Sequence, residues 1–489
     1  MTRSTKKTGN KTGIIVLLLY IGLIFLLLAA CGAGDDISGD SSDITESTEN
    51  RENSENSTQS EESEISNGTS TSDESQISEE SSTYESSAPS ESSSEESSAP
   101  SESEDESKDP PVKEDYMKGM WVSQFDMQSV YLDGGVQRSK ASFTSMVNTI
   151  VSNIKKDGFN TVFLQMRPYG DSFYISEYYP VSRFVAGSYG SSISYDPIEI
   201  FIDRANAAGL SVHGWINPLR LMTPAEMSSV GSEFLVKQWY TAGGERVVEV
   251  NGRLYLNPAY PEARELIADG AAEILRKYNV DGIHIDDYFY PTSALSFDAA
   301  SYAESGFGSL VAFRENNINL LVKGLYDAVH TTDSDAVFGV SPAGNIATVR
   351  VNHYVDVEKW CSEDGYLDYI LPQIYFGFLH GSCPFDGMVD AWSAIVTNPK
   401  VKYYVGMSGG NAFGAYNGAI STWAGTEAGK YEWINNTDVL KRSFEYIFAD
   451  DTVDGYVFFC YQYLYSPTNG TPVINLQEEY DNFIGVILS

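Results

Sequence analysis

The chain has 489 residues, and its 68 acidic side chains outnumber its 31 basic ones, which gives a formal net charge of −37 at pH 7. A chain this acidic does not bind nucleic acid or anionic lipid through its bulk charge. We therefore expect no nucleic-acid partner, and the function must be sought in local motifs.

The first 30 residues have the composition of an export signal. A basic start is followed by an apolar run from Ile14 to Leu28, which ends in Leu28-Ala29-Ala30-Cys31. A basic segment, an apolar segment and small residues before a cleavage point are typical of secretion. The cysteine directly after Leu-Ala-Ala resembles a bacterial lipobox, which implies a lipid anchor of the palmitate type on Cys31. An uncleaved transmembrane anchor is the alternative. Both interpretations predict an extracytoplasmic protein held at the membrane.

Residues 31–115 are dominated by Ser, Glu, Thr and Asp and contain very few apolar side chains. Low hydrophobicity combined with charge of one sign cannot offset the conformational entropy of the chain. The sequence therefore predicts a disordered linker that holds the following domain away from the membrane. Such a stalk suits a thick wall and so favours a Gram-positive cell.

From residue 116 to residue 489 the composition becomes globular and aromatic, and apolar β-rich runs alternate with helical patterns. This alternation predicts an α/β fold, a single (β/α)8 barrel of the TIM type. A doubly wound sheet is the alternative, but no glycine-rich phosphate loop follows the first strand. The predicted strands are Gly119–Phe125, Thr161–Arg167, Ser211–Asn217, Gly282–Asp286, Ala336–Ser341, Tyr369–Tyr375, Lys402–Met407 and Gly455–Tyr463. The predicted helices are Phe143–Lys156, Pro197–Ala208, Pro261–Tyr278, Val311–His330, Phe385–Val396 and Thr437–Phe448.

The stretch Asp281-Gly-Ile-His-Ile-Asp-Asp-Tyr-Phe-Tyr-Pro291 reads as a short buried strand that ends in charge. Because side chains alternate along a strand, His284 and Asp286 share one face. A buried carboxylate without a partner is costly, so Asp286 must be paired, solvated or used in chemistry. Asp287 follows where the strand gives way to a loop. Paired carboxylates at such a position predict a polar active site.

Polar and aromatic side chains also end the neighbouring strands, and in a barrel the carboxyl ends of all strands meet at one rim. The second strand ends in Gln165-Met-Arg167, and the third carries His213, Trp215 and Asn217 on one face. The fifth ends in Ser341-Pro-Ala-Gly-Asn345, and the sixth places Gln373 and Tyr375 on one face. We expect these residues to converge.

Paired acids surrounded by aromatic, amide, Arg and His side chains are typical of a sugar site. Aromatic rings stack on pyranose faces, amides and imidazoles bind hydroxyls, and carboxylates cleave the glycosidic bond. Two other interpretations remain open for the acids. They can be a helix cap or a surface ion pair, or they can bind a metal together with His284 and His213 in a metal-dependent hydrolase or deacetylase. The sequence contains no zincin-type His spacing, and we predict neither a metal nor a cofactor.

Five stretches of the chain resemble one family. They are Gly119-Met-Trp-Val, Gln165-Met-Arg-Pro-Tyr-Gly-Asp-Ser-Phe-Tyr, His213-Gly-Trp-Ile-Asn-Pro, the stretch from Asp281 to Pro291, and Pro372-Gln-Ile-Tyr. They are similar to the bacterial glycosyl-hydrolase-like 10 family of (β/α)8 barrels, whose members are often lipoproteins. The resemblance covers nearly all of the chain from about Met117 onward.

The resemblance implies glycoside hydrolysis at the cell envelope, and one branch of the family cuts peptidoglycan glycan strands that have lost their stem peptides. It implies catalytic roles for Asp286 and Asp287. Together with the strand ends it predicts a set of substrate-binding residues, namely Arg167, His213, Trp215, Asn217, His284, Tyr288, Gln373 and Tyr375. A catalytically silent carbohydrate-binding barrel is the alternative from another class.

The mechanism depends on where a second acid lies. The seventh predicted strand carries no carboxylate, so both candidate acids lie on the fourth. Adjacent acids there resemble substrate-assisted hexosaminidases, in which the acetamido oxygen of the sugar attacks. In that hypothesis Asp287 protonates the leaving oxygen, Asp286 orients the acetamido group and Tyr375 bonds its carbonyl, or the two acids exchange roles. The other hypothesis takes a second acid from a loop, and its candidates are Asp171, Glu177 and Asp364.

Three cysteines follow Cys31, namely Cys361, Cys383 and Cys460. An odd number allows at most one disulfide, and Cys361 with Cys383 is the nearer pair in sequence. Free buried thiols are the alternative.

Overall fold

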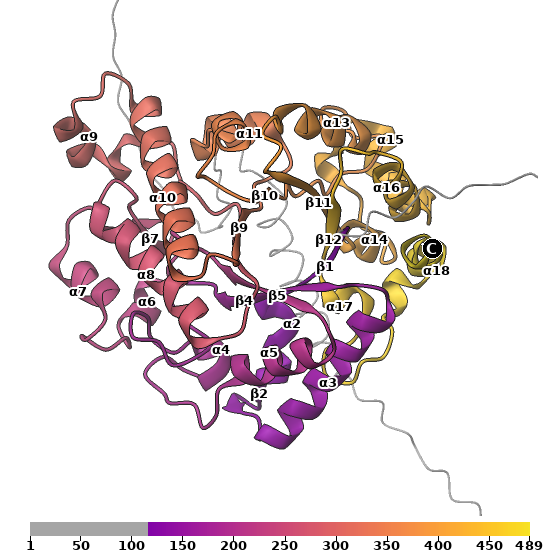
Figure 1. The fold of residues 1–489 in the computed structure, drawn as a ribbon, viewed down its shortest axis with the longest axis horizontal. Coiled ribbons are helices and arrows are strands. Elements are labelled where there is room, and N and C mark those ends of the chain that lie inside the picture. Colours follow the sequence, from indigo (N-terminus) through magenta and orange to yellow (C-terminus); the bar gives the residue numbers. More distant parts are fainter. Residues whose placement is uncertain (1–115) are drawn as a thin grey trace, which may run out of the picture. The chain divides into compact units, whose positions relative to one another are not determined.

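Eight parallel strands close into a barrel in the order β1-β12-β11-β10-β9-β8-β5-β4 (Figure 1). The computed structural model describes residues 116–489, so the predictions for the signal (1–30), for Cys31 and for the linker (31–115) lie outside the described residues. The strands are β1 Met117–Val122, β4 Thr161–Arg167, β5 Ser211–Ile216, β8 Gly282–Ile285, β9 Val337–Val340, β10 Tyr369–Ile370, β11 Lys402–Ser408 and β12 Gly455–Phe459. The predicted (β/α)8 barrel is confirmed.

Helices surround the barrel in the described part of the chain. The longer ones are α3 Lys140–Lys156, α5 Pro197–Ala207, α8 Pro261–Lys277, α10 Leu310–Thr332, α13 Phe385–Ile395, α16 Val439–Phe448 and α18 Gln477–Leu488. Shorter ones are α2 Gln124–Tyr131, α4 Arg183–Ala186, α6 Pro224–Met227, α7 Leu235–Ala242, α9 Ala299–Ser305, α11 Ile346–His353, α12 Val357–Ser362, α14 Gly410–Ala415, α15 Glu427–Asn435 and α17 Tyr461–Leu464. Between residues 116 and 489, no helix is both long and apolar enough to cross a membrane.

Helix starts follow the expected capping chemistry. The Asp196 carboxylate accepts the N–H groups of Ile198 and Glu199 at the start of α5, and Pro197 occupies the first turn. At the start of α2, Ser123 and Asp126 form a capping box. This box ends β1 at Val122, three residues before the predicted end of the strand, because the Ser123 cap commits the chain to a helix.

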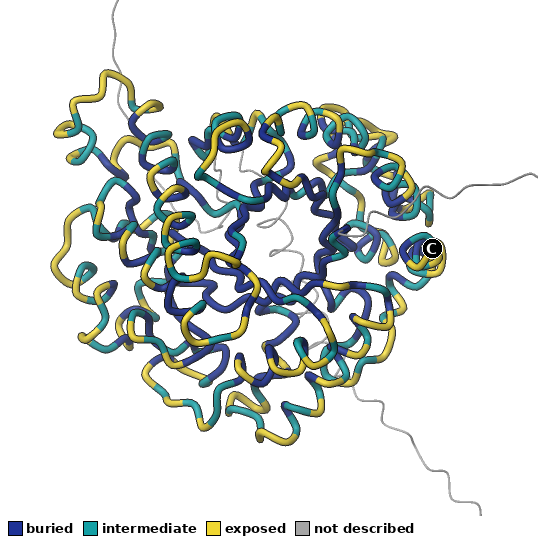
Figure 2. Tube along the Cα trace, in the orientation of Figure 1, coloured by how far each residue is buried: buried dark blue, intermediate teal, exposed yellow. Residues whose placement is uncertain are grey.

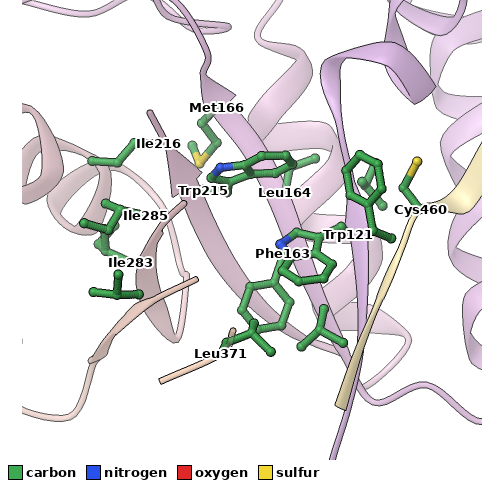
Figure 3. Close-up of a cluster of buried hydrophobic side chains, with 14 of the residues drawn as sticks. Trp121, Phe163, Leu164, Met166, Trp215, Ile216, Ile283, Ile285, Leu371 and Cys460 are labelled. Atoms are coloured by element: carbon green, nitrogen blue, oxygen red, sulfur yellow. The ribbon is translucent and has the colours of Figure 1, made fainter. Parts of the chain in front are cut away.

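The strands are buried on both faces, as a barrel covered by helices requires (Figure 2, dark blue). Ile283 and Ile285 of β8 belong to the apolar layer under the helices, whereas His284 points into the barrel. Inside the barrel, Trp121 of β1 and Phe163 of β4 lie with ring centroids 6.0 Å apart (Figure 3). The alternation that the sequence predicted for β8 is therefore confirmed.

A hairpin of β6 Val247–Val250 and β7 Arg253–Leu256 lies in the long connection between β5 and α8. Asn251 and Gly252 form its turn with φ of 50° and 76°. Positive φ at both positions is what a type I′ hairpin turn needs, and Asn-Gly is its usual sequence. The hairpin anchors the segment after β5, because Leu221 donates its backbone N–H to Leu254 O at 2.9 Å. A second, shorter hairpin joins β2 Leu132–Asp133 and β3 Val136–Gln137.

The thiols of Cys361, Cys383 and Cys460 are free and buried. Burial raises the pKa of the Cys361 thiol to about 12. The structure thus has the free-thiol form rather than the Cys361–Cys383 disulfide. Cys361 packs as a small apolar group, whereas Cys383 Sγ lies 3.7 Å from the Ser382 hydroxyl and Cys460 Sγ accepts the Gln462 side-chain N–H at 3.6 Å.

Candidate active site

A cavity opens at the carboxyl ends of the barrel strands. Its wall is lined by Trp121, Gln124, Phe125, Gln165, Trp215, Arg220, Asp286, Asp287, Tyr288, Gln373, Tyr375 and Phe459. The lining contains both predicted catalytic acids and four of the predicted substrate-binding residues, Trp215, Tyr288, Gln373 and Tyr375. In residues 116–489, Asp286 and Asp287 are the two acids of this cavity wall.

Asp286 is held by a chain of amides with a fixed direction. The backbone N–H of Gln124 donates to Gln165 Oε1 at 2.7 Å, so the other end of the Gln165 amide must be its NH2 group. That group donates to Asn217 Oδ1 at 2.8 Å, and Asn217 Nδ2 therefore faces Asp286 and donates to Oδ2. Because a backbone N–H can only donate, the whole chain is oriented from Gln124 toward the carboxylate.

The two oxygens of Asp286 consequently differ. Oδ2 also accepts the Trp215 indole N–H at 3.2 Å, whereas Oδ1 receives a long contact of 3.5 Å from the backbone N–H of Tyr288. With two N–H donors on Oδ2, a proton on this carboxyl group belongs on Oδ1. Asn217 does not line the cavity itself, so it acts on Asp286 rather than on a ligand in that wall.

Asp287 lies beside Asp286 in a different environment. Its carboxylate is half-buried, and the Gln373 side chain donates a hydrogen bond to it. The Gln373 amide also donates to Ser341 O at 3.2 Å, which holds it across the end of β9. Arg220 lies near both acids, and its guanidinium is 4.2 Å from the ring centroid of Tyr288 and 4.7 Å from that of Tyr169.

Both carboxyl groups hold protons more tightly than a free aspartate. Burial raises the pKa of Asp286 well above its usual value, the neighbouring charge of Asp287 raises it further, and the Arg220 charge opposes both effects. Burial raises the pKa of Asp287 to about 6, although the Gln373 hydrogen bond and Arg220 lower it. A pair of coupled acids with elevated pKa values is suited to proton transfer near neutral pH.

The structure does not bring His213 and His284 into the cavity wall. The Trp121 indole N–H donates to His284 Nε2 at 3.3 Å, so His284 carries its proton on Nδ1, which lies 3.2 Å from the Tyr369 hydroxyl. The Tyr369 hydroxyl then donates to His213 Nδ1 at 3.0 Å. Burial lowers the pKa of His213 to about 4 and that of His284 well below its usual value, so both are neutral. They form a hydrogen-bonded layer inside the barrel.

Arg167 is likewise outside the cavity. Its guanidinium is 4.2 Å from the ring centroid of Tyr179, and its side chain is buried against Gly270 of α8. A strand irregularity between Gln165 and Arg167 turns the end of β4, so the two residues face opposite sides. Gln165 therefore reaches the cavity, and Arg167 packs between the barrel and the helices.

The candidate loop acids do not line the cavity either. Asp171 is fully buried in its own loop, where it accepts the N–H of Tyr169 and the hydroxyl of Tyr189. Glu177 is exposed, and Asp364 pairs with Lys400 just before β11, at the opposite end of the strands. No group of three or more His, Cys, Asp or Glu side chains with the arrangement of a metal site occurs between residues 116 and 489.

Several cavity residues were absent from the predicted set, namely Trp121, Gln124, Phe125, Gln165, Arg220 and Phe459. Gln165 and Trp121 stand in the motifs at the ends of their strands, so the strand alternation contains the signal for them. Arg220 lies three residues after Asn217 in a loop, and the β6–β7 hairpin fixes its place through a bridge to Tyr255. No periodicity of the sequence points to it.

Comparison with known proteins agrees with this geometry. The profile of the family Glycosyl hydrolase-like 10 matches residues 116–415. The chain is 29% identical over 405 residues to the glycosyl hydrolase DigH of Escherichia coli strain K12, covering 74% of this chain and 87% of that protein. It is 32% identical over 285 residues to the glycosyl hydrolase YngK of Bacillus subtilis strain 168, covering 53% of this chain and 54% of that protein.

Among solved structures, the catalytic domain of a β-amylase from Paenibacillus polymyxa aligns with 77% of this chain and with 99% of that domain, at a TM-score of 0.46 and 12% identity. This likeness is too distant to assign a role to any residue. The family match covers more than half of the chain and includes the strand that carries Asp286 and Asp287. The chain therefore belongs to the Glycosyl hydrolase-like 10 family and is a glycoside hydrolase.

Proposed function

We propose that the enzyme cleaves glycosidic bonds in an N-acetylated cell-wall glycan, namely peptidoglycan glycan strands without stem peptides. The observation that carries this proposal is the pair Asp286 and Asp287, both with raised pKa values, in a cavity lined by aromatic rings. Aromatic faces suit the apolar C–H faces of pyranose rings, and carboxyl groups supply acid catalysis.

The reaction that fits this arrangement is substrate-assisted. The acetamido oxygen of the sugar attacks the anomeric carbon, and the bond to the leaving oxygen breaks as Asp287 gives that oxygen its proton. In this step Asp286 must be ionised, so that its Oδ1 accepts the acetamido N–H while Oδ2 keeps the hydrogen bonds from Trp215 and Asn217. Water then opens the cyclic intermediate and returns a proton to Asp287. In this mechanism Tyr375, which lines the same cavity, bonds the carbonyl of the acetamido group.

One observation supports each of these proposed roles. Asp287 is the less buried acid, and its pKa of about 6 suits a group that both gives and takes a proton. Asp286, with its amide chain, is the better fixed of the two and suits an orienting role. The exchanged assignment, with Asp286 as the acid, is the alternative, and its support is that burial and the charge of Asp287 raise the pKa of Asp286 well above its usual value.

We further propose that the enzyme works outside the cytoplasmic membrane, tethered through a lipid on Cys31 and reaching the wall along residues 31–115. The support is the sequence alone, namely the apolar run followed by Leu28-Ala29-Ala30-Cys31 and the acidic Ser-rich stretch after it. Metabolic labelling with a clickable palmitate analogue tests this proposal. Label should enter the parent chain and not a Cys31→Ala variant.

The activity is tested by incubating the purified chain with peptide-free and peptide-bearing peptidoglycan strands, with and without a chelator, and identifying the products by mass spectrometry. We expect cleavage of the bare strands in either condition. Asp287→Asn should lower the rate by about 10²–10⁴. Cleavage abolished by chelator would support a metal-dependent hydrolase instead. Binding of strands without any product would support a silent carbohydrate-binding barrel.

A further inference from the structure

Two segments extend the catalytic end of the barrel beyond the cavity. Residues 371–384 join β10 to α13, and residues 409–438 join β11 to α16 and contain α14, the 3-10 turn Thr422–Ala424 and α15. Both segments follow the carboxyl ends of barrel strands, which is the end where the cavity opens (Figure 1, orange to gold).

These segments expose an unusual amount of apolar surface. All seven tryptophans lie in the described residues, and Trp423 is the exposed one, with 67% of its surface accessible. Leu379 and Ile420 are also exposed, at 48% and 39%. We call Leu379, Ile420 and Trp423 the Trp423 platform. The three residues lie on segments that hydrogen bonds join, since the Thr426 hydroxyl donates to Leu379 O and Gly381 donates to Ala424 O. Exposed apolar side chains on joined segments beside a site are candidates for a binding surface.

The segments that carry the platform are held rigidly. The Glu432 carboxylate of α15 is buried and accepts the backbone N–H groups of Phe378 and Leu379 at 3.1 and 2.9 Å. The Thr426 hydroxyl donates to Leu379 O at 2.7 Å, and Gly381 donates to Ala424 O at 2.7 Å. A buried carboxylate bonded to loop N–H groups fixes both segments, so the exposed surface is presented in one conformation.

The platform is also connected to the cavity. Asn411 of α14 donates its side-chain N–H to Tyr375 O at 3.0 Å, and Tyr375 lines the cavity. Ser421 donates its hydroxyl to Asn411 Oδ1 at 3.4 Å, two residues before Trp423. Two hydrogen bonds therefore link the cavity wall to the segment that presents the exposed indole.

We propose that Trp423 forms a distal subsite, on which a sugar ring of a bound glycan strand stacks outside the cavity. This inference rests on the proposed function and adds that the enzyme grips a polymer along its length. The cavity is lined by only twelve residues, so a glycan strand of several sugars extends beyond it across the rim. The hydrogen-bonded link from Tyr375 leads toward Trp423, and an exposed indole on a rigid support is a suitable stacking surface for a pyranose ring.

A second copy of the chain is the competing occupant, because apolar platforms also mediate dimers. The ring chemistry separates the two. Stacking on a sugar needs a flat aromatic face, which Trp423→Tyr keeps and Trp423→Leu removes. A dimer contact needs apolar area, which Trp423→Leu largely keeps.

The test measures binding by calorimetry to the full chain in an Asp287→Asn background, with a disaccharide and a hexasaccharide of β-1,4-linked N-acetylglucosamine as probes. We expect Trp423→Leu to bind the hexasaccharide about tenfold more weakly and the disaccharide as the parent does. Trp423→Tyr should stay within about threefold of the parent for both. Leu320→Ala, which removes an exposed apolar side chain from the outer helix α10, should change neither affinity.

Equal hexasaccharide binding by Trp423→Leu and the parent would overturn the subsite, and so would equal weakening for both probes. A parent that is a dimer by sedimentation, and whose dimer Trp423 variants disrupt, would assign the platform to a second copy instead. If the active parent chain cleaves no glycan strand and binds neither probe, the proposed function fails. If it cleaves strands while Trp423 is without effect, only the subsite fails.

Discussion

Gln165 and Asn217 meet through one hydrogen bond of 2.8 Å between their side-chain amides, and this bond determines which end of Asn217 faces Asp286. The Gln124 backbone N–H occupies the other end of Gln165, so neither amide can turn over without losing a partner. Gln165 therefore determines which groups face the Asp286 carboxyl group, although it contacts that group only through Asn217.

Replacing Gln165 by Glu should reverse the chain. The introduced carboxylate still accepts from Gln124 but has no N–H for Asn217 Oδ1, so Asn217 turns its NH2 toward that carboxylate and its oxygen toward Asp286. The loss of a donor to Oδ2 and the added negative charge should raise the pKa of Asp286 further, lower kcat and move the pH–rate profile of the enzyme. The profile measured from about pH 4 to about pH 9 checks this result, because it spans the ordinary and the raised pKa of a carboxyl group.

Asn160 offers a matched control at the opposite end of β4. Its Oδ1 accepts the backbone N–H of Lys118 at 2.9 Å, and its Nδ2 donates to Tyr116 O at 2.9 Å. Asn160→Asp makes the same chemical change in the same kind of contact, far from Asp286. It should leave the profile in place, and a shift equal to that of Gln165→Glu would contradict the orienting chain.

The rate of the enzyme should fall as pH rises through about 6, because Asp287 must be protonated to act as the acid and its pKa is raised to about 6. Gln373 stabilises the carboxylate form of Asp287, so Gln373→Leu should raise that pKa and move the alkaline limb upward. Phe125→Leu, another change in the cavity wall, should not move it. If Gln373→Leu leaves the alkaline limb of the pH–rate profile where it is, the result would favour Asp286 as the acid.

Asp286→Asn should stabilise the fold, increasingly so as pH rises. The pKa of Asp286 is higher in the folded state than in the unfolded chain. The stability that its bound proton contributes is therefore complete at a pH below the unfolded-state pKa, and it is lost as the pH rises through the folded-state pKa. An asparagine does not ionise and has no such loss. Above the folded-state pKa, the free energy of unfolding of the variant should therefore exceed that of the parent by about 1.4 kcal/mol for each pH unit by which folding raises the pKa of Asp286. Urea unfolding at about pH 5 and about pH 8 measures the difference.

Asp364→Asn serves as the opposite case. Hydrogen bonds from Lys400 and Asn398 lower the pKa of Asp364, so its carboxylate is favoured in the folded state and the variant should gain no stability at about pH 8. Equal behaviour of the two variants would show that the environment of Asp286 does not penalise its charge.

Tyr369→Phe should lower the free energy of unfolding of the barrel. The hydroxyl serves His213 and His284 at once, and its removal leaves two buried ring nitrogens without a partner, at a cost of about 1–3 kcal/mol each. Tyr403 is equally buried but donates only to Val389 O at 3.1 Å, so Tyr403→Phe should cost less. Denaturant unfolding of both variants compares them, and equal losses would argue against the shared hydroxyl.

The elements of the barrel could largely be predicted, because each strand is a short apolar run bounded by a helix signal. The exceptions are strand ends. Besides β1, β12 ends at Phe459 rather than at the predicted Tyr463, because α17 begins at Tyr461. In the same way β10 ends at Ile370, whereas the prediction extended it to Tyr375. Pro372 has no N–H for a ladder, and Ile374 and Tyr375 donate to the carbonyls of Pro372 and Gln373, so only isolated bridges from Gln373 to Ala343 and Gly406 continue the pairing. Gln373 and Tyr375 still reach the cavity, but from a turn.

The sequence predicts which side chains of the candidate site point into the barrel, but it does not predict how far below the rim each one lies. Strand alternation correctly placed His213, Trp215, His284 and Asp286 on inward faces. It could not tell which inward residue stands at the rim and which lies below, because that depends on how neighbouring strands are staggered. The position of Arg220 depends on the β6–β7 hairpin. The Asn251-Gly252 pair is typical of a hairpin turn, but the pattern of barrel strands does not include it.

The three buried thiols allow local unfolding of this domain to be measured without an added probe site. Cys361, Cys383 and Cys460 sit in separate parts of the core with raised pKa values, so a thiol reagent reaches them only when the surrounding structure opens. The domain also has no disulfide among its described residues that must form or survive. Its fold should therefore be indifferent to reductants, and mass spectrometry of labelled cysteines would show which part of the barrel opens first.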